Sequence, residues 1–217
     1  MYADGKSNQT MTQRKTPTDA ELLRLSIAGD EQGFTALYRR HQGSVYRFAL
    51  LMSGSTAIAE EVTQEVFLVL IRAAQRYDPA RGSLNAYLYG VARNQVLRVL
   101  ERERPYVPLV EESETAEVVM LAQLIAQDDP FGDCTRNELI NLVRQAVLAL
   151  PAHYREVVVL CDFQEMSYAE AAVALDCAIG TVNSRLHRGH ALLLKKLRAA
   201  GKLDSALSDV QQMRCFV

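Results

Sequence analysis

The sequence predicts an all-α protein of two small helical domains joined by an acidic linker. Hydrophobic residues make up 49% of the 217 residues, which is enough for a sizeable core. Gly and Pro are few, at 11 and 6, as expected for long helices rather than many turns. Apolar residues recur at intervals of three and four through most of the chain, and no segment keeps the alternation of apolar and polar residues that is typical of a half-buried strand.

The first domain is expected over residues 18–106, after a polar N-terminal extension at residues 1–17 that is expected to be disordered. Thr18 and Asp19 supply the N-terminal cap of its first helix. A second and a third helix follow, and the triplet Ser-Gly-Ser at residues 53–55 separates them.

A loop and a fourth helix complete the first domain. The turn-rich loop covers residues 77–83, and the fourth helix ends at Pro105, which has no backbone N–H to continue it. The acidic linker is assigned to residues 107–134, because residues 106–135 hold seven Asp or Glu and no Lys or Arg. A short helix is expected inside the linker near residues 118–126.

The second domain is expected over residues 135–200 and is followed by a C-terminal tail at residues 201–217. One of its helices begins with Pro151 in the first turn, where Pro is favoured. Ser167 and Glu170 have the spacing of a capping box at the start of a short helix.

A helix-turn-helix is expected at the end of the second domain. The small side chains of Ala171 and Ala172 allow a second helix to pack closely, and Asp176 tolerates the left-handed conformation at the turn. Ile179 and Val182 are expected to anchor the second helix in the core. The second helix of such a motif can enter the major groove of DNA.

This second helix separates apolar from polar side chains. Val182, Leu186, Leu193 and Leu197 share one face, whereas residues 177–203 hold six Lys or Arg and no acid. Phosphates would repel carboxylates, and Asn, Arg, Ser and Thr are residue types that read base edges. The pattern favours DNA binding; the alternative is a solvated amphipathic helix whose C-terminal cations stabilise the helix dipole.

Composition limits the other classes of protein. The net charge is −2, but residues 72–104 hold seven basic and three acidic residues. The four Cys show neither a C-x-x-C pair nor zinc-site spacing, which favours reduced thiols over metal binding or redox sensing. No apolar run is long enough to span a membrane, and the polar N-terminus lacks the apolar core of a secretory signal. We therefore expect a cytoplasmic protein with no membrane insertion and no cofactor.

Two sets of motifs resemble the extracytoplasmic-function (ECF, group IV) sigma factors of bacterial RNA polymerase, in the sigma-70 family. SYAEAAVALDCAIGTVNSRLHRGHALLLKKL resembles domain four of that family, and LPAHYREVVVL is similar to the start of the same domain. AEEVTQEVFLVL, residues 59–70, resembles the core-binding helix of domain two. YDPARGSLNAYLYGVARNQVLRVLERER resembles the segment that melts promoters and recognises the −10 element. The resemblance covers roughly residues 18–200.

The resemblance implies a transcription initiation factor that is not an enzyme. Domain two would bind the β′ clamp helices of core RNA polymerase and help to melt the −10 element of promoter DNA. Domain four would contact the β flap and read the −35 element. A further implied partner is an anti-sigma factor. The acidic linker would either mimic RNA near the exit path or simply be solvated.

Matching the motifs residue by residue implies three groups of site residues. Those expected to bind core polymerase are Glu61, Gln64 and Glu65, and the alternative is a solvated acidic face. Those expected at the −10 element, where a base must be extruded to be read, are Tyr77, Asp78, Arg81, Ser83, Asn85, Arg93, Asn94 and Arg98. Those expected at the −35 element are Thr181, Asn183, Ser184, Arg185, His187 and Arg188. The family commonly has Arg or Lys at the position of Asn183, so the resemblance does not predict which promoter sequence this protein prefers.

Some nearby positions are expected to be structural. Val62, Val66, Phe67 and Leu70 are expected in the core of domain two, and Tyr87 and Tyr89 are expected to be partly core. Two other functions remain open. A transcriptional regulator with a similar DNA-reading helix would leave residues 59–70 unexplained. An enzyme would need a catalytic group, and no Ser-His-Asp set, paired carboxylates, Gly-rich phosphate loop or metal cluster stands out.

Overall fold

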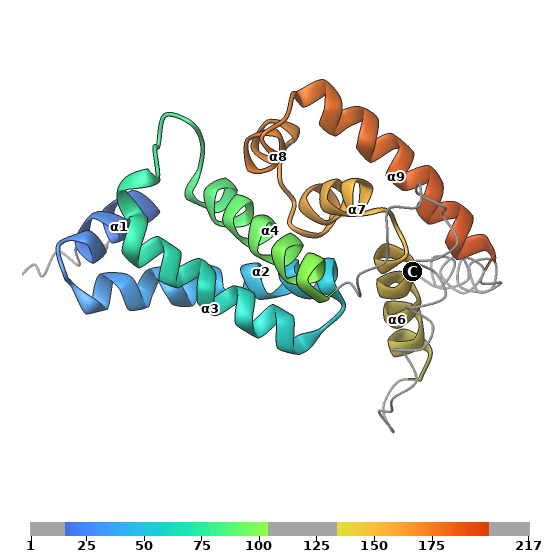
Figure 1. The fold of residues 1–217 in the computed structure, drawn as a ribbon, viewed down its shortest axis with the longest axis horizontal. Coiled ribbons are helices and arrows are strands. Elements are labelled where there is room, and N and C mark those ends of the chain that lie inside the picture. Colours follow the sequence, from blue (N-terminus) through green and yellow to red (C-terminus); the bar gives the residue numbers. More distant parts are fainter. Residues whose placement is uncertain (1–15, 104–133, 200–217) are drawn as a thin grey trace, which may run out of the picture.

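The computed structural model describes residues 16–103 and 134–199. Within these ranges the chain forms helices and connecting turns and no strand, which confirms the all-α prediction. Two groups of helices lie side by side (Figure 1). The acidic linker with its expected short helix, the C-terminal tail and most of the N-terminal extension lie outside the described residues, as do Cys134's side chain and Cys215.

The N-terminal unit consists of four α-helices and one 3₁₀ turn. In order they are α1 (Asp19–Ile27), α2 (Glu31–Ser53), α3 (Thr56–Ala73), the turn Ala74–Arg76 and α4 (Leu84–Glu103). The C-terminal unit consists of α6 (Cys134–Leu148), α7 (Ala152–Val158), a π-helical turn (Val159–Phe163), α8 (Tyr168–Leu175) and α9 (Ile179–Ala199).

The helix boundaries in the N-terminal unit follow from caps. The predicted cap at Thr18 is present as a full capping box with Glu21. Gly54 ends α2 in the left-handed conformation, at φ 74°, which glycine adopts without steric cost. Ser55 then accepts a hydrogen bond from the backbone N–H of Ile58 and begins α3. The predicted break at residues 53–55 is therefore a C-cap followed directly by an N-cap.

The core of the N-terminal unit lies between α2, α3 and α4. The predicted core residues of α3 are all buried, and they are Val62, Val66, Phe67 and Leu70. They face Leu37, Val45 and Phe48 of α2, which belong to the same cluster of buried side chains. Tyr89 on α4 is also buried, with its ring 5.4 Å from that of Phe48, whereas Tyr87 is half-buried.

The C-terminal unit contains a feature that the sequence did not predict. α7 begins at Ala152, with Pro151 at the N-cap rather than in the first turn, and after Val158 the helix widens into the π-helical turn. Cys161 lies in this turn and is a free, half-buried thiol. Burial raises the pKa of this thiol to about 11, and Asp162 contributes in the same direction. A thiol of this kind is unreactive near neutral pH.

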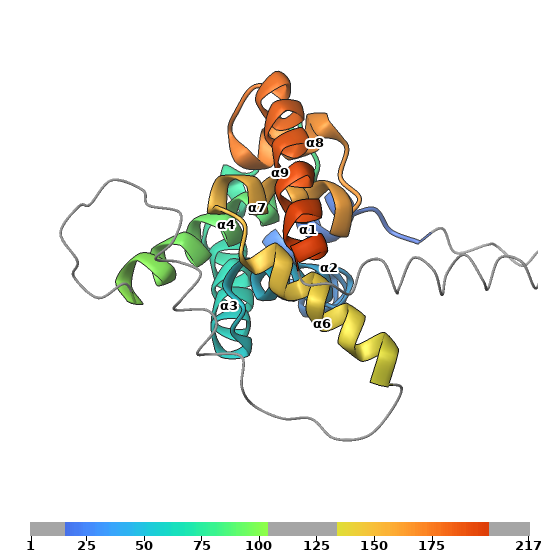
Figure 2. The ribbon, with the colours of Figure 1, turned by 90° about the vertical axis from the view of Figure 1, so that its right-hand side faces the viewer.

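The two units are packed together and share one continuous cluster of buried residues. α4 contacts α8, and α2 contacts α6 and α7, with Arg155 of α7 donating to the Met52 carbonyl near the end of α2. Figure 2 shows α7, α8 and α9 above the N-terminal unit, with α9 running downward from the top of the molecule. The sequence predicted two separate domains and gave no indication of this contact.

The burial pattern along α3 generates a stability prediction. Leu70 is 1% exposed and its neighbour Ile71 is 55% exposed. Leu70→Ala should lower the free energy of unfolding by about 2–5 kcal/mol, because it removes methyl groups and leaves a cavity. Ile71→Ala should change it by less than about 0.5 kcal/mol. Urea denaturation followed by circular dichroism measures both, and equal effects of the two substitutions would contradict this packing.

Candidate nucleic-acid interface

The helix-turn-helix forms as predicted. Ser167 caps α8 and makes a reciprocal capping box with Glu170. These hydrogen bonds lower the pKa of the Glu170 carboxyl, so the box favours its ionised form. Asp176 ends α8 in the left-handed conformation, with φ 50° and ψ 50°. α9 begins at Ile179, three residues later.

The apolar face of α9 differs from the prediction at one residue. Val182 and Leu186 are buried, and Leu197 lies at the buried face near the helix end. Ile179, however, is 53% exposed, so the prediction that it anchors the helix is wrong. It is the first residue of α9, where the side chain lies beyond the edge of the core. Val182, one turn later, carries the anchoring role.

The polar face of α9 presents four of the six residues expected at the −35 element. The exposed side chains are those of Asn183, Ser184, His187 and Arg188. Thr181 is half-buried near the start of the helix, and the Ser184 hydroxyl donates to the Thr181 carbonyl at 3.1 Å. Donors therefore extend over two turns of α9, the part that enters the groove in helix-turn-helix proteins.

Arg185 lies differently from its neighbours. Its guanidinium is turned toward α7, with NH1 3.2 Å from Oε1 of Glu156. The Glu156 side chain is 2% exposed. A buried carboxylate thus holds the Arg185 guanidinium against α7, away from the exposed polar face.

The residues expected at the −10 element form a second group, on loop 77–83 and α4. The loop is held by the Tyr77 hydroxyl, which donates to the Gly82 carbonyl at 3.2 Å, and by Asp78, whose carboxylate accepts from the N–H of Ala80. The Tyr77 and Tyr87 rings lie 5.7 Å apart. Burial raises the pKa of both phenols, so both are protonated at neutral pH.

A hollow of about 250 Å³ lies beside these two tyrosines. Tyr77, Arg81, Ser83 and Asn94 line it from the N-terminal unit, and α8 closes it from the other side with Val173 and Ala174. Five of the eight residues expected at the −10 element line this hollow, and they are Tyr77, Asp78, Arg81, Ser83 and Asn94.

The remaining three residues of this group have different surroundings. Arg98 is exposed. Arg93 reaches the C-terminal unit, with Nε 2.6 Å from Oε2 of Glu156. Asn85 is tied to α2, because its Oδ1 lies 3.0 Å from Nδ1 of the buried His41.

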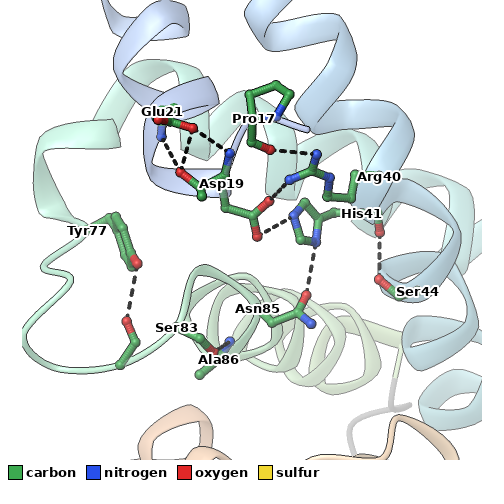
Figure 3. Close-up of polar contacts among 12 residues, drawn as sticks. Pro17, Asp19, Glu21, Arg40, His41, Ser44, Tyr77, Ser83, Asn85 and Ala86 are labelled. Carbon is green, nitrogen blue, oxygen red and sulfur yellow. Dashed lines mark hydrogen bonds and ion pairs between the residues drawn. The ribbon is translucent and has the colours of Figure 1, made fainter. Parts of the chain in front are cut away.

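Figure 3 shows that His41 stands between Asn85 and the first helix. The His41 Nε2 lies 3.0 Å from Oδ2 of Asp19, and the same Asp19 pairs with Arg40, which also donates to the Pro17 carbonyl. This chain of contacts fixes the N-terminal end of α4 relative to α1 and α2. Asn85 therefore has a positioning role in this structure.

The residues expected to bind core polymerase lie on the outer side of α3. Glu61 and Gln64 are exposed and Glu65 is half-buried, and Glu61 makes an exposed ion pair with Arg102 at 3.5 Å. The same side carries the exposed apolar residues Leu68 and Ile71, which the sequence reasoning missed. Leu68 follows Gln64 by four residues and Ile71 follows Leu68 by three, and this helical spacing was the available signal.

A second hollow, of about 410 Å³, lies between α2 and α3. Gln64 lines this hollow, together with residues that include Tyr38, Arg39, Tyr46 and Glu60. The outer side of α3 therefore continues into a concave surface rather than a flat one. Among the described residues no group of His, Cys, Asp or Glu could hold a metal ion, and no described helix is long and apolar enough to cross a membrane.

Comparison with known proteins finds relatives for both units. The sequence model of Sigma-70 region 2 matches residues 37–105, and that of Sigma-70 region 4 matches residues 140–193. The ECF RNA polymerase sigma factor SigW of Bacillus subtilis is 30% identical over 172 residues, which cover 78% of this chain and 91% of SigW. SigM of Mycobacterium tuberculosis is 34% identical over 188 residues, covering 85% of this chain and 87% of SigM.

Solved structures show the same fold. CnrH, in a complex with the cytosolic domain of CnrY, superposes with a TM-score of 0.61 at 25% identity, over 83% of this chain and 97% of CnrH. The sigma factor RpoE of Bartonella quintana, in a complex with the anti-sigma factor NepR, gives a TM-score of 0.57 at 21% identity, over 77% of this chain and 98% of that chain.

The turn of the helix-turn-helix generates a prediction. A non-glycine residue at positive φ is strained, although Asp tolerates this region better than most. Asp176→Gly should preserve the free energy of unfolding or raise it by up to about 1 kcal/mol. Asp176→Val should lower it by about 1–3 kcal/mol, because a β-branched residue disfavours this conformation. Chemical denaturation compares the three proteins, and a stable Val variant would show that the turn is not left-handed.

Proposed function

Because this chain belongs to the ECF family of RNA polymerase sigma factors, we propose that it binds core polymerase through α3 and reads promoter DNA with two surfaces. Loop 77–83 together with α4 contacts the −10 element, and α9 contacts the −35 element. The observation that carries the proposal is the polar face of α9. It exposes Asn183, His187 and Arg188, and its described residues include no acid.

The chemistry of α9 supports recognition in the major groove. Asn can make two hydrogen bonds to adenine, and Arg can make two to guanine or pair with a phosphate. Lys195, Lys196 and Arg198 extend the cationic surface toward the helix end, where they would contact the backbone. Arg185 has a supporting part in this proposal, because Glu156 holds its guanidinium away from the exposed edge.

The outer side of α3 supports a protein partner rather than DNA. Glu61 and Glu65 would be repelled by phosphates, whereas they suit a basic protein surface. Leu68 and Ile71 add apolar area beside these polar groups, a composition typical of protein interfaces. We assign this surface to the β′ clamp helices and the C-terminal unit to the β flap.

The factor itself performs no chemistry in this proposal. Its described residues would supply contacts to DNA and to protein partners, and phosphodiester bond formation would belong to the polymerase. Two structural relatives are seen in complexes with partner proteins, one of which is named as an anti-sigma factor. We therefore include an anti-sigma factor among the partners of this chain, and we place the protein in the cytoplasm with the polymerase.

Charge reversal on α3 tests the polymerase contact. Glu65→Arg should reduce binding to core polymerase at least tenfold, because it places a cation against the basic surface expected there. Glu31→Arg, an equal charge change on the exposed start of α2, is the matched control. Binding is measured by surface plasmon resonance with immobilised core polymerase, and circular dichroism verifies the fold. Wild-type affinity in Glu65→Arg would exclude this side of α3 as the contact.

Two substitutions on α9 test DNA reading. Asn183→Arg should change which −35 sequences are selected, because Asn and Arg pair with different bases. Arg188→Ala should weaken binding by about 1–3 kcal/mol if Arg188 reads a base, or lower affinity for all sequences and reduce the salt slope by about one if it contacts a phosphate. Arg24→Ala, on the exposed side of α1, controls for loss of one positive charge.

The measurement is selection from a randomised −35 library by the polymerase-bound protein, at two salt concentrations. The function assigned to α9 fails if both variants select the same sequences as the wild type with the same affinity and salt dependence.

A further inference from the structure

The contact between the two units covers the surface assigned to the −10 element. A Cβ atom on Gly90 of α4 would lie only 3.2 Å from the backbone carbonyl oxygen of Ala174 on α8. The two helices therefore approach at backbone distance. At the loop, a Cβ on Gly82 would lie 3.0 Å from the side chain of Val173. DNA cannot occupy this space while α8 is there.

Polar contacts across the same boundary engage residues that are assigned to DNA. The Ser83 hydroxyl donates to Oε1 of Glu170 on α8 at 3.4 Å. Arg93 makes the stronger contact, with Nε 2.6 Å and NH2 3.5 Å from the two carboxylate oxygens of Glu156. Arg93 is thus paired with a buried anion of the opposite unit.

The Glu156 carboxylate is buried and is shared by arginines of both units. It is 2% exposed, and it pairs with Arg185 of its own unit through the same oxygen, Oε1, that faces NH2 of Arg93. A buried carboxylate is stable only when it is paired and hydrogen-bonded, so the two arginines together neutralise it. A DNA phosphate would need the same N–H donors of Arg93 that Glu156 already occupies.

One buried polar group at the boundary between the units lacks a hydrogen-bond partner among the described residues, which is consistent with a reversible contact. The Tyr89 hydroxyl donates to Oε1 of Gln164 at 2.9 Å across the boundary, yet Nε2 of Gln164 is buried without a hydrogen-bond partner among the described residues. A buried donor without a partner is unfavourable. A buried ion pair recovers only part of its desolvation cost, so the pair between Arg93 and Glu156 need not make closure irreversible.

We propose that Glu156 is a latch that holds the free protein closed, by competing with promoter DNA for Arg93 and keeping α8 over the −10 surface. The latch rests on the proposed function, because only DNA binding gives closure a consequence. Opening would separate Arg93 from Glu156, expose Ser83 and leave Glu156 paired with Arg185. Binding to polymerase, which holds the two units at separate sites, would release the latch.

The test follows the distance between the units and DNA binding in the full-length protein. Nitroxide labels at the exposed positions 35 on α2 and 191 on α9, in a background without native cysteines, report the distance by electron–electron resonance. Fluorescence anisotropy with a short random-sequence DNA duplex reports affinity. Glu156→Gln removes the anion, and Glu101→Gln, at an exposed position of α4, is the matched change of charge.

A second variant opens the boundary without changing any charge. Gly90→Leu places a side chain against the α8 backbone, which cannot move aside as a flexible side chain would. If Glu156→Gln does not fold by circular dichroism, Arg93→Gln replaces it for the distance measurement, because it breaks the same pair while Arg185 still faces Glu156.

The wild type and Glu101→Gln should show one short distance. Glu156→Gln and Gly90→Leu should show longer, broader distances and bind the duplex more tightly, by about tenfold if the closed form is 90% populated. The latch is overturned if the distance between the two labels in Glu156→Gln equals that in the wild type. The same holds for Arg93→Gln if that variant is used instead. Equal DNA affinity of the wild type and both opened variants overturns it as well.

Transcription by polymerase loaded with the wild-type protein separates the two proposals. If polymerase with the wild-type protein initiates transcription but Glu156→Gln shows no increase in distance, the latch is refuted and the proposed function stands. If the distance increases in Glu156→Gln but polymerase with the wild-type protein does not initiate transcription, the proposed function is refuted.

Discussion

The arrangement of this protein depends on one buried guanidinium. Arg155, on α7, is 7% exposed and donates to the Met52 carbonyl near the end of α2 at 2.6 Å and to the carbonyls of Leu148 and Leu150 where α6 ends. Carbonyls in the last turn of a helix lack intrahelical partners and carry the negative end of its dipole. The fixed fork of an arginine can satisfy several of them at once.

The position of α7 determines the electrostatics around it. Because Glu156 is the next residue after Arg155, the cation that holds the helix ends also sets where the buried carboxylate stands. From there the carboxylate faces Arg93 of one unit and Arg185 of the other. Adjacent residues of opposite charge on α7 therefore connect the packing of the helix ends with the surfaces that are proposed to bind DNA.

Sequence patterns predicted the local structure well because that structure depends on short-range rules. The cap at Thr18, the capping box at Ser167 and the turn at Asp176 follow from neighbouring residues, and the buried face of α3 follows from helical periodicity. Ile179 was assigned wrongly because periodicity does not show where a helix extends beyond the core.

Contacts between distant segments were beyond the reach of the same reasoning. Arg155 and Glu156 look like an ordinary polar pair in the sequence, and nothing near them points to α2 or α4. Periodicity correctly placed Asn183, His187 and Arg188 at the surface. It could not show that Arg93 and Arg185 share one carboxylate, or that Asn85 is held by His41, since those partners lie 29 to 63 residues away.

The close approach at Gly90 has a consequence for the intrinsic stability of α4. A glycine in the interior of a helix is less favourable than alanine by roughly 0.5–1 kcal/mol, because the unfolded chain has more conformations to lose. This disadvantage of α4 is present whether or not α8 lies against it. The missing side chain is useful only in the packed form, where it lets the α8 backbone approach α4 closely. The helix is thus less stable on its own than its length would allow, and its sequence is a compromise between secondary-structure propensity and the fit to a neighbouring unit.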